Sequence, residues 1–235
     1  MIGSNHKHLN IAIDGPAGAG KSTLSRMLAA RLGFLYIDTG ALYRTIGLFA
    51  LRSGISPLDA EKVCALLSNV KIALKFEADG QHVYLNDEDV SAFIRSPEVS
   101  IAASNVSAIP QVRAFLLSLQ KEIAAQNSVV MDGRDIGTVV LPNADLKIFL
   151  TASAEDRATR RHKEMVERGE NADYNTVLED IKKRDAADSG RDIAPLKPAE
   201  DAVLVDTTGY TLEKSLETLT ALVKVSLKVS LYITE

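Results

Sequence analysis

The sequence predicts an α/β protein with a five-stranded parallel sheet and helices on both of its faces. Short apolar runs alternate with longer segments of helical periodicity, which is the order of elements in a parallel sheet with crossover helices. The runs are mostly apolar, as strands buried on both faces usually are. The expected strands are Leu9–Asp14, Phe34–Asp38, Ser128–Asp132, Asp145–Leu150 and Ala202–Asp206.

Carboxylates mark the ends of most of these strands. Because open α/β sheets bind ligands beyond the carboxyl ends of their strands, this grouping points to the functional edge. Any one of these aspartates is explained as well by the common use of aspartate in turns and helix caps. The four residues are Asp14, Asp38, Asp132 and Asp206.

Helical stripes follow the first two strands and recur near the C-terminus, with apolar residues three or four positions apart. We assign them to the core. They are Leu24, Met27, Leu28 and Leu32, then Leu42, Ile46, Phe49 and Ala50, and finally Leu212, Leu216, Leu219 and Val223.

Two segments depart from this order. Residues 69–86 alternate apolar and polar side chains around Asp79-Gly80, a hairpin turn signal, and predict a small antiparallel sheet inserted into the core. Residues 223–233 carry an apolar side chain at every odd position, which leaves open an edge strand or a frayed tail after the last helix.

Composition excludes several classes of protein. The 235 residues are 46% hydrophobic and carry a net charge of −4, which fits a globular protein and argues against bulk nucleic-acid binding. No apolar stretch is long enough to span a bilayer, and residues 1–10 show no secretory signal. The single Cys64 excludes an internal disulfide, and the four histidines lack metal-ligand spacing. We expect a cytoplasmic, monomeric enzyme.

A phosphate-binding loop follows the first strand. Residues 15–23 match G-x-x-x-x-G-K-[ST] in full, between an expected strand and an expected helix. In such loops the backbone N–H groups and the helix N-terminus surround the phosphates of a nucleoside triphosphate. The lysine reaches the β- and γ-phosphates, and the serine hydroxyl binds Mg²⁺. The predicted ATP-binding residues are Gly15, Pro16, Ala17, Gly18, Ala19, Gly20, Lys21, Ser22 and Thr23.

Two further features indicate which class of proteins with a phosphate-binding loop this chain belongs to. The guanine-binding tetrapeptide N-K-x-D is absent, which argues against a GTPase switch. The run Val129–Asp132 is an apolar strand that ends in a carboxylate near the expected metal, and Asp132 is predicted to contact Mg²⁺ through water. Arg134, two residues later, suits a second substrate that carries phosphate.

Four separated motifs now resemble the bacterial cytidylate kinases, over about residues 9–222. They are the loop from Asp14 to Ser22, Asp38-Thr-Gly-Ala-Leu-Tyr-Arg44, Asp132-Gly-Arg-Asp-Ile-Gly-Thr-Val-Val140, and Arg184 with Arg191-Asp-Ile-Ala-Pro-Leu196. The resemblance implies the nucleoside-monophosphate-kinase fold and transfer of the γ-phosphoryl group of ATP to CMP or dCMP. It implies a core of residues 9–68 and 105–225, an inserted monophosphate-binding subdomain of residues 69–104, and a lid of residues 154–187.

The resemblance also implies roles for individual residues. Arg44, Arg134 and Arg191 would hold the acceptor phosphate and the transferring group, and Lys21, Arg134 and Arg191 would be catalytic. Ser104, Arg113 and Asp135 would bind the cytosine, and Arg184 and Asp188 the ribose. Thr39 stands where serine is common in the family and keeps the hydroxyl. From the lid, Arg157 and Arg161 are candidates for the ATP side, although exposed helix charges would explain them equally well.

The chemistry of the base supports an acidic residue at position 135. A carboxylate accepts a hydrogen bond from the N4 amino group of cytosine and repels the oxygen that uracil carries there. Two other hypotheses remain: a kinase with the same phosphate-binding loop that acts on another small acceptor, and a regulatory nucleotide-binding protein. A nucleic-acid-processing ATPase is a third, although the acidic net charge disfavours it.

Overall fold

The computed structural model describes residues 8–77, 80–191 and 193–227. The chain forms two compact units. Unit 1 comprises residues 1–36 and 127–235, and unit 2 comprises residues 37–126.

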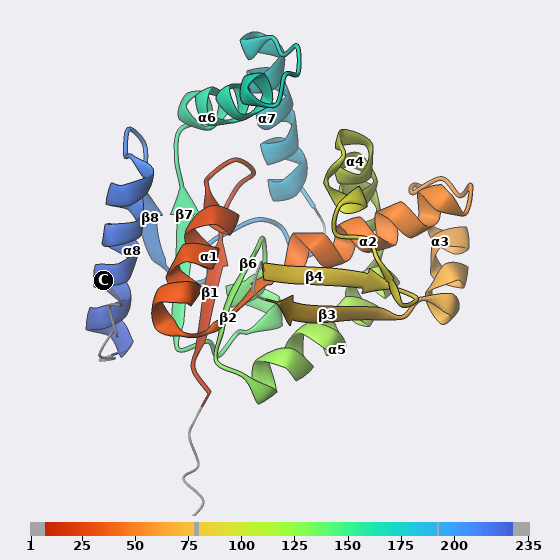
Figure 1. Ribbon diagram of the computed structural model, residues 1–235, viewed down its shortest axis with the longest axis horizontal. Helices are drawn as coiled ribbons and strands as arrows, with labels where there is room; N and C mark the ends of the chain where they lie inside the picture. Colours follow the sequence, from red (N-terminus) through yellow and green to blue (C-terminus); the bar gives the residue numbers. More distant parts are fainter. Residues whose placement is uncertain (1–7, 78–79, 192, 228–235) are drawn as a thin grey trace, which may run out of the picture. The chain divides into compact units, whose positions relative to one another are not determined.

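The main sheet has five strands in the order β2-β6-β1-β7-β8 (Figure 1). Its ladders are parallel where β1 pairs with β6 and β7 and where β7 pairs with β8. Each strand lies within one residue of the expected range, so the predicted fold class is confirmed. The strands are β1 (Asn10–Asp14), β2 (Leu35–Asp38), β6 (Val129–Gly133), β7 (Leu146–Thr151) and β8 (Val203–Asp206).

The core of unit 1 forms where two helices pack on the main sheet. α1 (Lys21–Leu32) and α8 (Leu212–Leu227) contact each other, and their apolar stripes share one cluster with β1 and β7. Ile11 and Ile148 of that cluster are almost fully buried. The packed sheet therefore supplies a rigid base for the loop between β1 and α1.

The end of the chain differs from the sequence-based expectation. Up to Leu227, where the described part ends, residues of the alternating segment belong to α8 and not to an edge strand or a frayed tail. Val223 is fully buried beside Leu219, whereas Val225 is 79% exposed. The helical stripe therefore continues to Val223, and the apolar residue at 225 faces solvent. Residues 228–233 of the segment lie outside the described residues.

Two further helices of unit 1 form a pair. α6 (Ala154–Glu167) and α7 (Tyr174–Ser189) contact each other through a small cluster that includes Ala158, Val177 and Ile181. Ser153 and Asp173 cap their N-termini with side-chain hydrogen bonds. A helical pair was expected here, and its movement as a lid stays a prediction.

Unit 2 combines helices with the small sheet. The antiparallel order β3-β4-β5 agrees with the alternating pattern of residues 69–86, while Asp79 of the expected turn lies outside the described residues. The apolar faces of helices and sheet share one core. The elements are α2 (Thr39–Arg52), α3 (Ala60–Leu66), β3 (Ile72–Glu77), β4 (Gly80–Leu85), β5 (Glu88–Asp89), α4 (Pro97–Val106) and α5 (Pro110–Gln126), with short 3₁₀ turns at Leu67–Asn69 and Phe93–Arg95. The boundaries expected at residues 69 and 104 remain predictions.

Among the described helices, none combines the length and the apolar character that a membrane crossing requires.

Candidate active site

The loop between β1 and α1 approaches the neighbouring strand so closely that it needs glycine at its start. Gly15 has a φ of +152°, and a Cβ at this position would lie 1.9 Å from the carbonyl oxygen of Leu150. Only glycine tolerates both the dihedral and the approach. The loop then leads into α1, so that backbone N–H groups and the positive end of the helix dipole meet at one place.

Lys21 is the first residue of α1 and is 5% exposed. Its Nζ donates a hydrogen bond to the carbonyl oxygen of Pro16 over 2.8 Å. Burial and the nearby guanidinium of Arg134 hold the pKa of this amine well below its usual value, against the opposing attraction of Asp132 and Asp14. An anionic phosphate next to the amine would therefore relieve an unfavourable arrangement of positive charge.

Ser22 and Asp132 bring together two oxygen groups of the kind that Mg²⁺ prefers. The Ser22 hydroxyl donates to Oδ2 of Asp132 over 2.9 Å, and the hydroxyl of Tyr36 donates to Oδ1 over 3.0 Å. Asp132 is 3% exposed. Hydroxyl and carboxylate oxygens are the ligands that Mg²⁺ prefers, so these residues fit the ion. Tyr36, which orients the carboxylate, was not singled out in the sequence, although it lies on β2 two residues before the terminal aspartate.

A second charged group follows β6. Arg134 donates from Nε to Oδ2 of Asp188 over 2.9 Å and from Nη1 to the carbonyl oxygen of Gly133 over 3.2 Å. Arg191 donates to the other carboxylate oxygen of Asp188. The structure thus brings together two arginines that the sequence predicts for phosphate binding, with one buried carboxylate between them.

The electrostatics of Asp188 follow from this bridge. The residue is 1% exposed. Burial alone would raise the pKa of Asp188, but the guanidinium groups of Arg134, Arg191 and Arg184 outweigh burial and hold the pKa below its usual value. Arg184 also acts on Lys21, so the predicted ribose residue belongs to the same charged group. Asp135, next to Arg134, is 5% exposed.

Of the two arginines on α6 that are predicted for the ATP side, Arg157 contacts the phosphate-binding loop. Its Nη1 donates to the carbonyl oxygen of Ala17 over 3.0 Å. The same guanidinium forms a two-pronged ion pair with Asp185 of α7, over 3.0 and 2.6 Å. Arg161 is 44% exposed in its side chain and pairs with Glu164 of its own helix at 3.9 Å. Asp185 was missed in the sequence because no local spacing links it to Arg157.

Within unit 2, Asp38 organises the start of α2. Its Oδ1 accepts the N–H of Ala41 over 3.0 Å as the helix cap, and its Oδ2 pairs with Arg44 over 2.7 Å. Arg95 lies 3.8 Å from the same oxygen. Thr39 is 3% exposed. The strand-end aspartate thus orients the arginine that the sequence predicts for the acceptor phosphate.

Ser104 and Arg113, also in unit 2, are joined through Ser107. The Ser107 hydroxyl donates to the carbonyl oxygen of Ser104 over 2.8 Å, and Nη1 of Arg113 donates to the carbonyl oxygen of Ser107 over 3.3 Å. The guanidinium carbon of Arg113 lies 5.8 Å from the ring centroid of Tyr43. The predicted base-binding residues on α4 and α5 therefore lie close together.

Comparison with known proteins identifies the family of the chain. A family model described as cytidylate kinase matches residues 11–225. A cytidylate kinase of Caldicellulosiruptor bescii is 53% identical over 211 residues, which cover 90% of this chain and 93% of the relative. A cytidylate kinase of Carboxydothermus hydrogenoformans is 50% identical over 206 residues, or 88% of this chain and 93% of the relative.

Among solved structures, an uncharacterized protein from Eubacterium ventriosum shares the fold. It matches with a TM-score of 0.51 at 14% identity, over 93% of this chain and 99% of that one. At this identity the likeness concerns the fold alone. The family model and the curated relatives, which extend over nearly all of the chain, show that it belongs to the cytidylate kinase family.

Proposed function

We propose that this protein transfers the γ-phosphoryl group of ATP to CMP or dCMP, giving ADP and CDP or dCDP. The observation that carries the proposal is the combination, within unit 1, of a phosphate-binding loop with the charged group of Arg134, Asp188 and Arg191. A loop alone serves many nucleotide hydrolases. A second set of cations suits an acceptor that is itself a phosphate ester.

On the ATP side, the backbone of residues 15–23 surrounds the phosphates and Lys21 contacts the β- and γ-phosphates. Arg157, already hydrogen-bonded to the loop, supports it from the lid, and Arg161 remains a candidate of lower rank because it pairs with Glu164. Ser22 and, through water, Asp132 would hold Mg²⁺. When bound, the ion neutralises charge on the phosphate oxygens.

On the acceptor side, Arg44, Arg134 and Arg191 bind the phosphate of the monophosphate. Arg134 uses Nε and Nη1 for Asp188 and Gly133, which leaves Nη2 for this contact. Asp135, Ser104 and Arg113 bind the cytosine, Arg184 and Asp188 the ribose, and Thr39 contributes its hydroxyl. Residues 69–104 form the inserted subdomain on this side.

The protein's contribution to the reaction is positioning and charge stabilisation. The acceptor oxygen is already anionic at neutral pH, so direct in-line transfer needs neither a strong general base nor a covalent intermediate on the enzyme. Lys21, Arg134 and Arg191 stabilise the charge on the transferring group. Closure of residues 154–187 excludes water, so that the phosphoryl group passes to the monophosphate rather than to solvent.

The decisive experiment is an acceptor panel of CMP, dCMP, UMP and AMP with ATP and Mg²⁺, followed by ADP release. We expect CMP and dCMP to be preferred. Asp135→Ala is expected to reduce the preference for CMP over UMP strongly, because the N4 amino group loses its acceptor. ATP consumption that does not depend on any acceptor would contradict the proposal, and an unchanged preference would remove Asp135 from the base site.

A further inference from the structure

Asp14, the last residue of β1, makes two hydrogen bonds that tie it to a distant segment. Oδ1 accepts the backbone N–H of Ile136 and Oδ2 accepts that of Gly137, each over 2.7 Å. The residue is 4% exposed. A buried carboxylate whose two oxygens both accept backbone N–H groups fixes the position of the segment that it binds.

These bonds lie directly after Arg134 and Asp135. In the β1–β6 ladder, Asp14 is also the register partner of Gly133, the residue before Arg134. The backbone of Arg134 and Asp135 is therefore held at both ends by one residue: by strand pairing before it and by the Asp14 side chain after it. No further β1–β6 pairing follows Gly133, so the side chain replaces the ladder where the strand stops.

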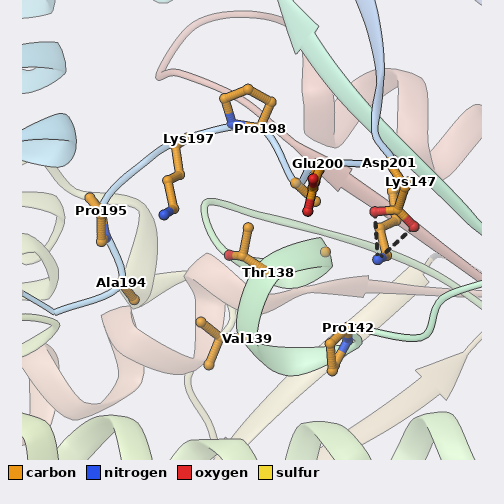
Figure 2. Close-up of a pocket in the computed structure, with 12 residues that line it drawn as sticks. Thr138, Val139, Pro142, Lys147, Ala194, Pro195, Lys197, Pro198, Glu200 and Asp201 are labelled. Carbon is orange, nitrogen blue, oxygen red and sulfur yellow. Dashed lines mark hydrogen bonds and ion pairs between the residues drawn. The ribbon is translucent and has the colours of Figure 1, made fainter.

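The far side of the same turn is also supported. A Cβ added to Gly137 would lie 3.2 Å from Cδ of Lys147 and 3.4 Å from Oδ2 of Asp14, so this position fits only a glycine without displacement. Lys147 in turn donates to both carboxylate oxygens of Asp201, over 2.8 and 2.9 Å (Figure 2). The turn at Ile136–Val140 thus lies between the Asp14 carboxylate and the Lys147 stem, beside a groove of about 620 Å³.

We propose that Asp14 is a positioning residue for the acceptor nucleotide: it contacts neither substrate, but its carboxylate holds Arg134 and Asp135 in the geometry that binds CMP. The inference rests on the roles proposed above for these two residues. The backbone of Asp14 itself is held by β6 and β7 through its register partners Gly133 and Phe149. Loss of the carboxylate should therefore disturb the acceptor side and leave the phosphate-binding loop in place.

The test compares Asp14→Asn with a matched control, Asp145→Asn. The amide keeps the shape of Asp14 but has one acceptor oxygen, so its NH₂ group faces a backbone N–H. Asp145 is also a carboxylate that accepts a backbone N–H, from Asn10 over 2.9 Å, but it does so at the opposite end of β1. Calorimetric titrations with CMP and with ADP and Mg²⁺ measure the two substrate sides separately, and steady-state kinetics give kcat/KM for CMP and UMP.

In Asp14→Asn we expect the Kd for CMP to rise about 10- to 100-fold, because a small misplacement of binding groups has effects of this size. The preference for CMP over UMP should fall, while ADP binding stays at the wild-type value. Asp14 also favours the charged form of Lys21, so a weaker affinity for ADP would indicate a charge effect on the loop and not a displaced turn. Gly137→Ala changes no charge and places a Cβ 3.2 Å from Cδ of Lys147 and 3.4 Å from Oδ2 of Asp14, so the crowded turn should change CMP binding in the same direction.

Equal losses for CMP and ADP, a similar loss in Asp145→Asn, or unchanged CMP binding would each overturn the assignment. Failure of the proposed function would look different: the wild-type protein would not bind CMP, or Asp135→Ala would keep the preference for CMP over UMP.

Discussion

The carboxylate of Asp188 accepts a hydrogen bond from Nε of Arg134 over 2.9 Å, although 54 residues separate them. Its other oxygen accepts from Arg191, so one buried carboxylate sets the spacing of two cations. Such a bridge offsets half of the positive charge of the two arginines and keeps their guanidinium groups close enough to share one phosphate.

Asp188→Ala should therefore lower kcat/KM for CMP by about 100-fold, since Arg134 and Arg191 lose the partner that sets their spacing, and a misplacement of about 1 Å has an effect of this size. A ribose contact through the 2′-hydroxyl adds a loss with CMP that dCMP does not share, whereas the spacing of the arginines affects both equally. Kinetics with the two acceptors measure the two contributions. Wild-type activity with both acceptors would contradict both roles.

The pKa of Asp188 also predicts a pH dependence of stability. Because its pKa in the folded protein lies below the usual value of 3.8, the ionised form stabilises the fold above that pH. The stabilisation is lost as pH falls below about 3.8 and through the folded-state pKa. Urea unfolding at neutral and acidic pH should show a smaller acid-induced loss in Asp188→Ala than in the wild type. Parallel pH profiles would contradict this.

Lys21→Met tests the lysine of the loop. We expect turnover to fall by about 1,000-fold, because one charged donor to the transferring group is lost. Since burial already disfavours the charged amine, the neutral side chain should not reduce the melting temperature. Activity assays and thermal unfolding check the two statements. Near-normal turnover would refute the assignment of Lys21. A large drop in melting temperature would mean that misfolding, and not the loss of a catalytic group, explains the lower activity.

The Ser22–Asp132 contact predicts an altered demand for magnesium. Ser22→Ala removes the hydroxyl oxygen and Asp132→Asn removes the negative charge of the carboxylate, so we expect half-maximal activity to require more Mg²⁺ at fixed ATP. Tyr36→Phe is the matched control, because it removes only the other hydrogen bond to Asp132, over 3.0 Å. If Ser22→Ala and Asp132→Asn needed no more Mg²⁺ than Tyr36→Phe does, neither residue would belong to the metal site.

The fold was largely predictable because burial patterns are local. Val129, Val130 and Met131 are all apolar, as is typical of a strand covered on both sides, and β6 lies within one residue of the expected strand Ser128–Asp132. The alternating pattern that begins at Val223 did not predict the structure, because this segment continues α8 and the apolar side chain of Val225 is exposed. A pattern of period two does not by itself show which side chains contact a core. β5 was missed because Glu88 and Asp89 carry no strand signal.

The candidate site was predictable in its residue types and less so in its pairings. The loop motif places Lys21 and Ser22 by itself, because motif, strand and helix are contiguous in sequence. The partners of the arginines are not contiguous: Arg157 meets Asp185 through the packing of α6 on α7, and Asp14 meets Gly137 across the sheet edge. Such contacts depend on tertiary structure, which one sequence does not display.

Arg157 and Arg161 provide a comparison within one helix. Arg157→Ala removes the hydrogen bond to Ala17 and leaves Asp185 without its partner, so we expect a higher KM for ATP and a lower kcat. Arg161→Ala removes a side chain that is 44% exposed and pairs at 3.9 Å, so a small effect is expected. Kinetics at varied ATP decide between them. Equal losses would return Arg161 to the ATP site, and no loss in either would remove both.

Stability and function should change in opposite directions at Asp14. Burial raises the pKa of this carboxyl from 3.8 to about 6, although the N–H groups of Gly137 and Ile136 lower it. Between these values the folded protein binds the proton more tightly than the unfolded chain does. The free energy of unfolding contributed by Asp14 therefore falls as pH rises through about 6, by about 3 kcal/mol.

Asp14→Asn has no such titration. It leaves one buried backbone N–H without an acceptor, which costs about 1 to 3 kcal/mol, and it avoids the cost of about 3 kcal/mol for the buried charge. We therefore expect the variant at pH 7.5 to be at least as stable as the wild type, with a flatter stability profile between pH 4 and 6, while its affinity for CMP is reduced. Urea unfolding across this range measures the profile. If Asp14→Asn were several kcal/mol less stable at pH 7.5, the carboxylate would serve the fold, and its cost could not be ascribed to holding Arg134 and Asp135.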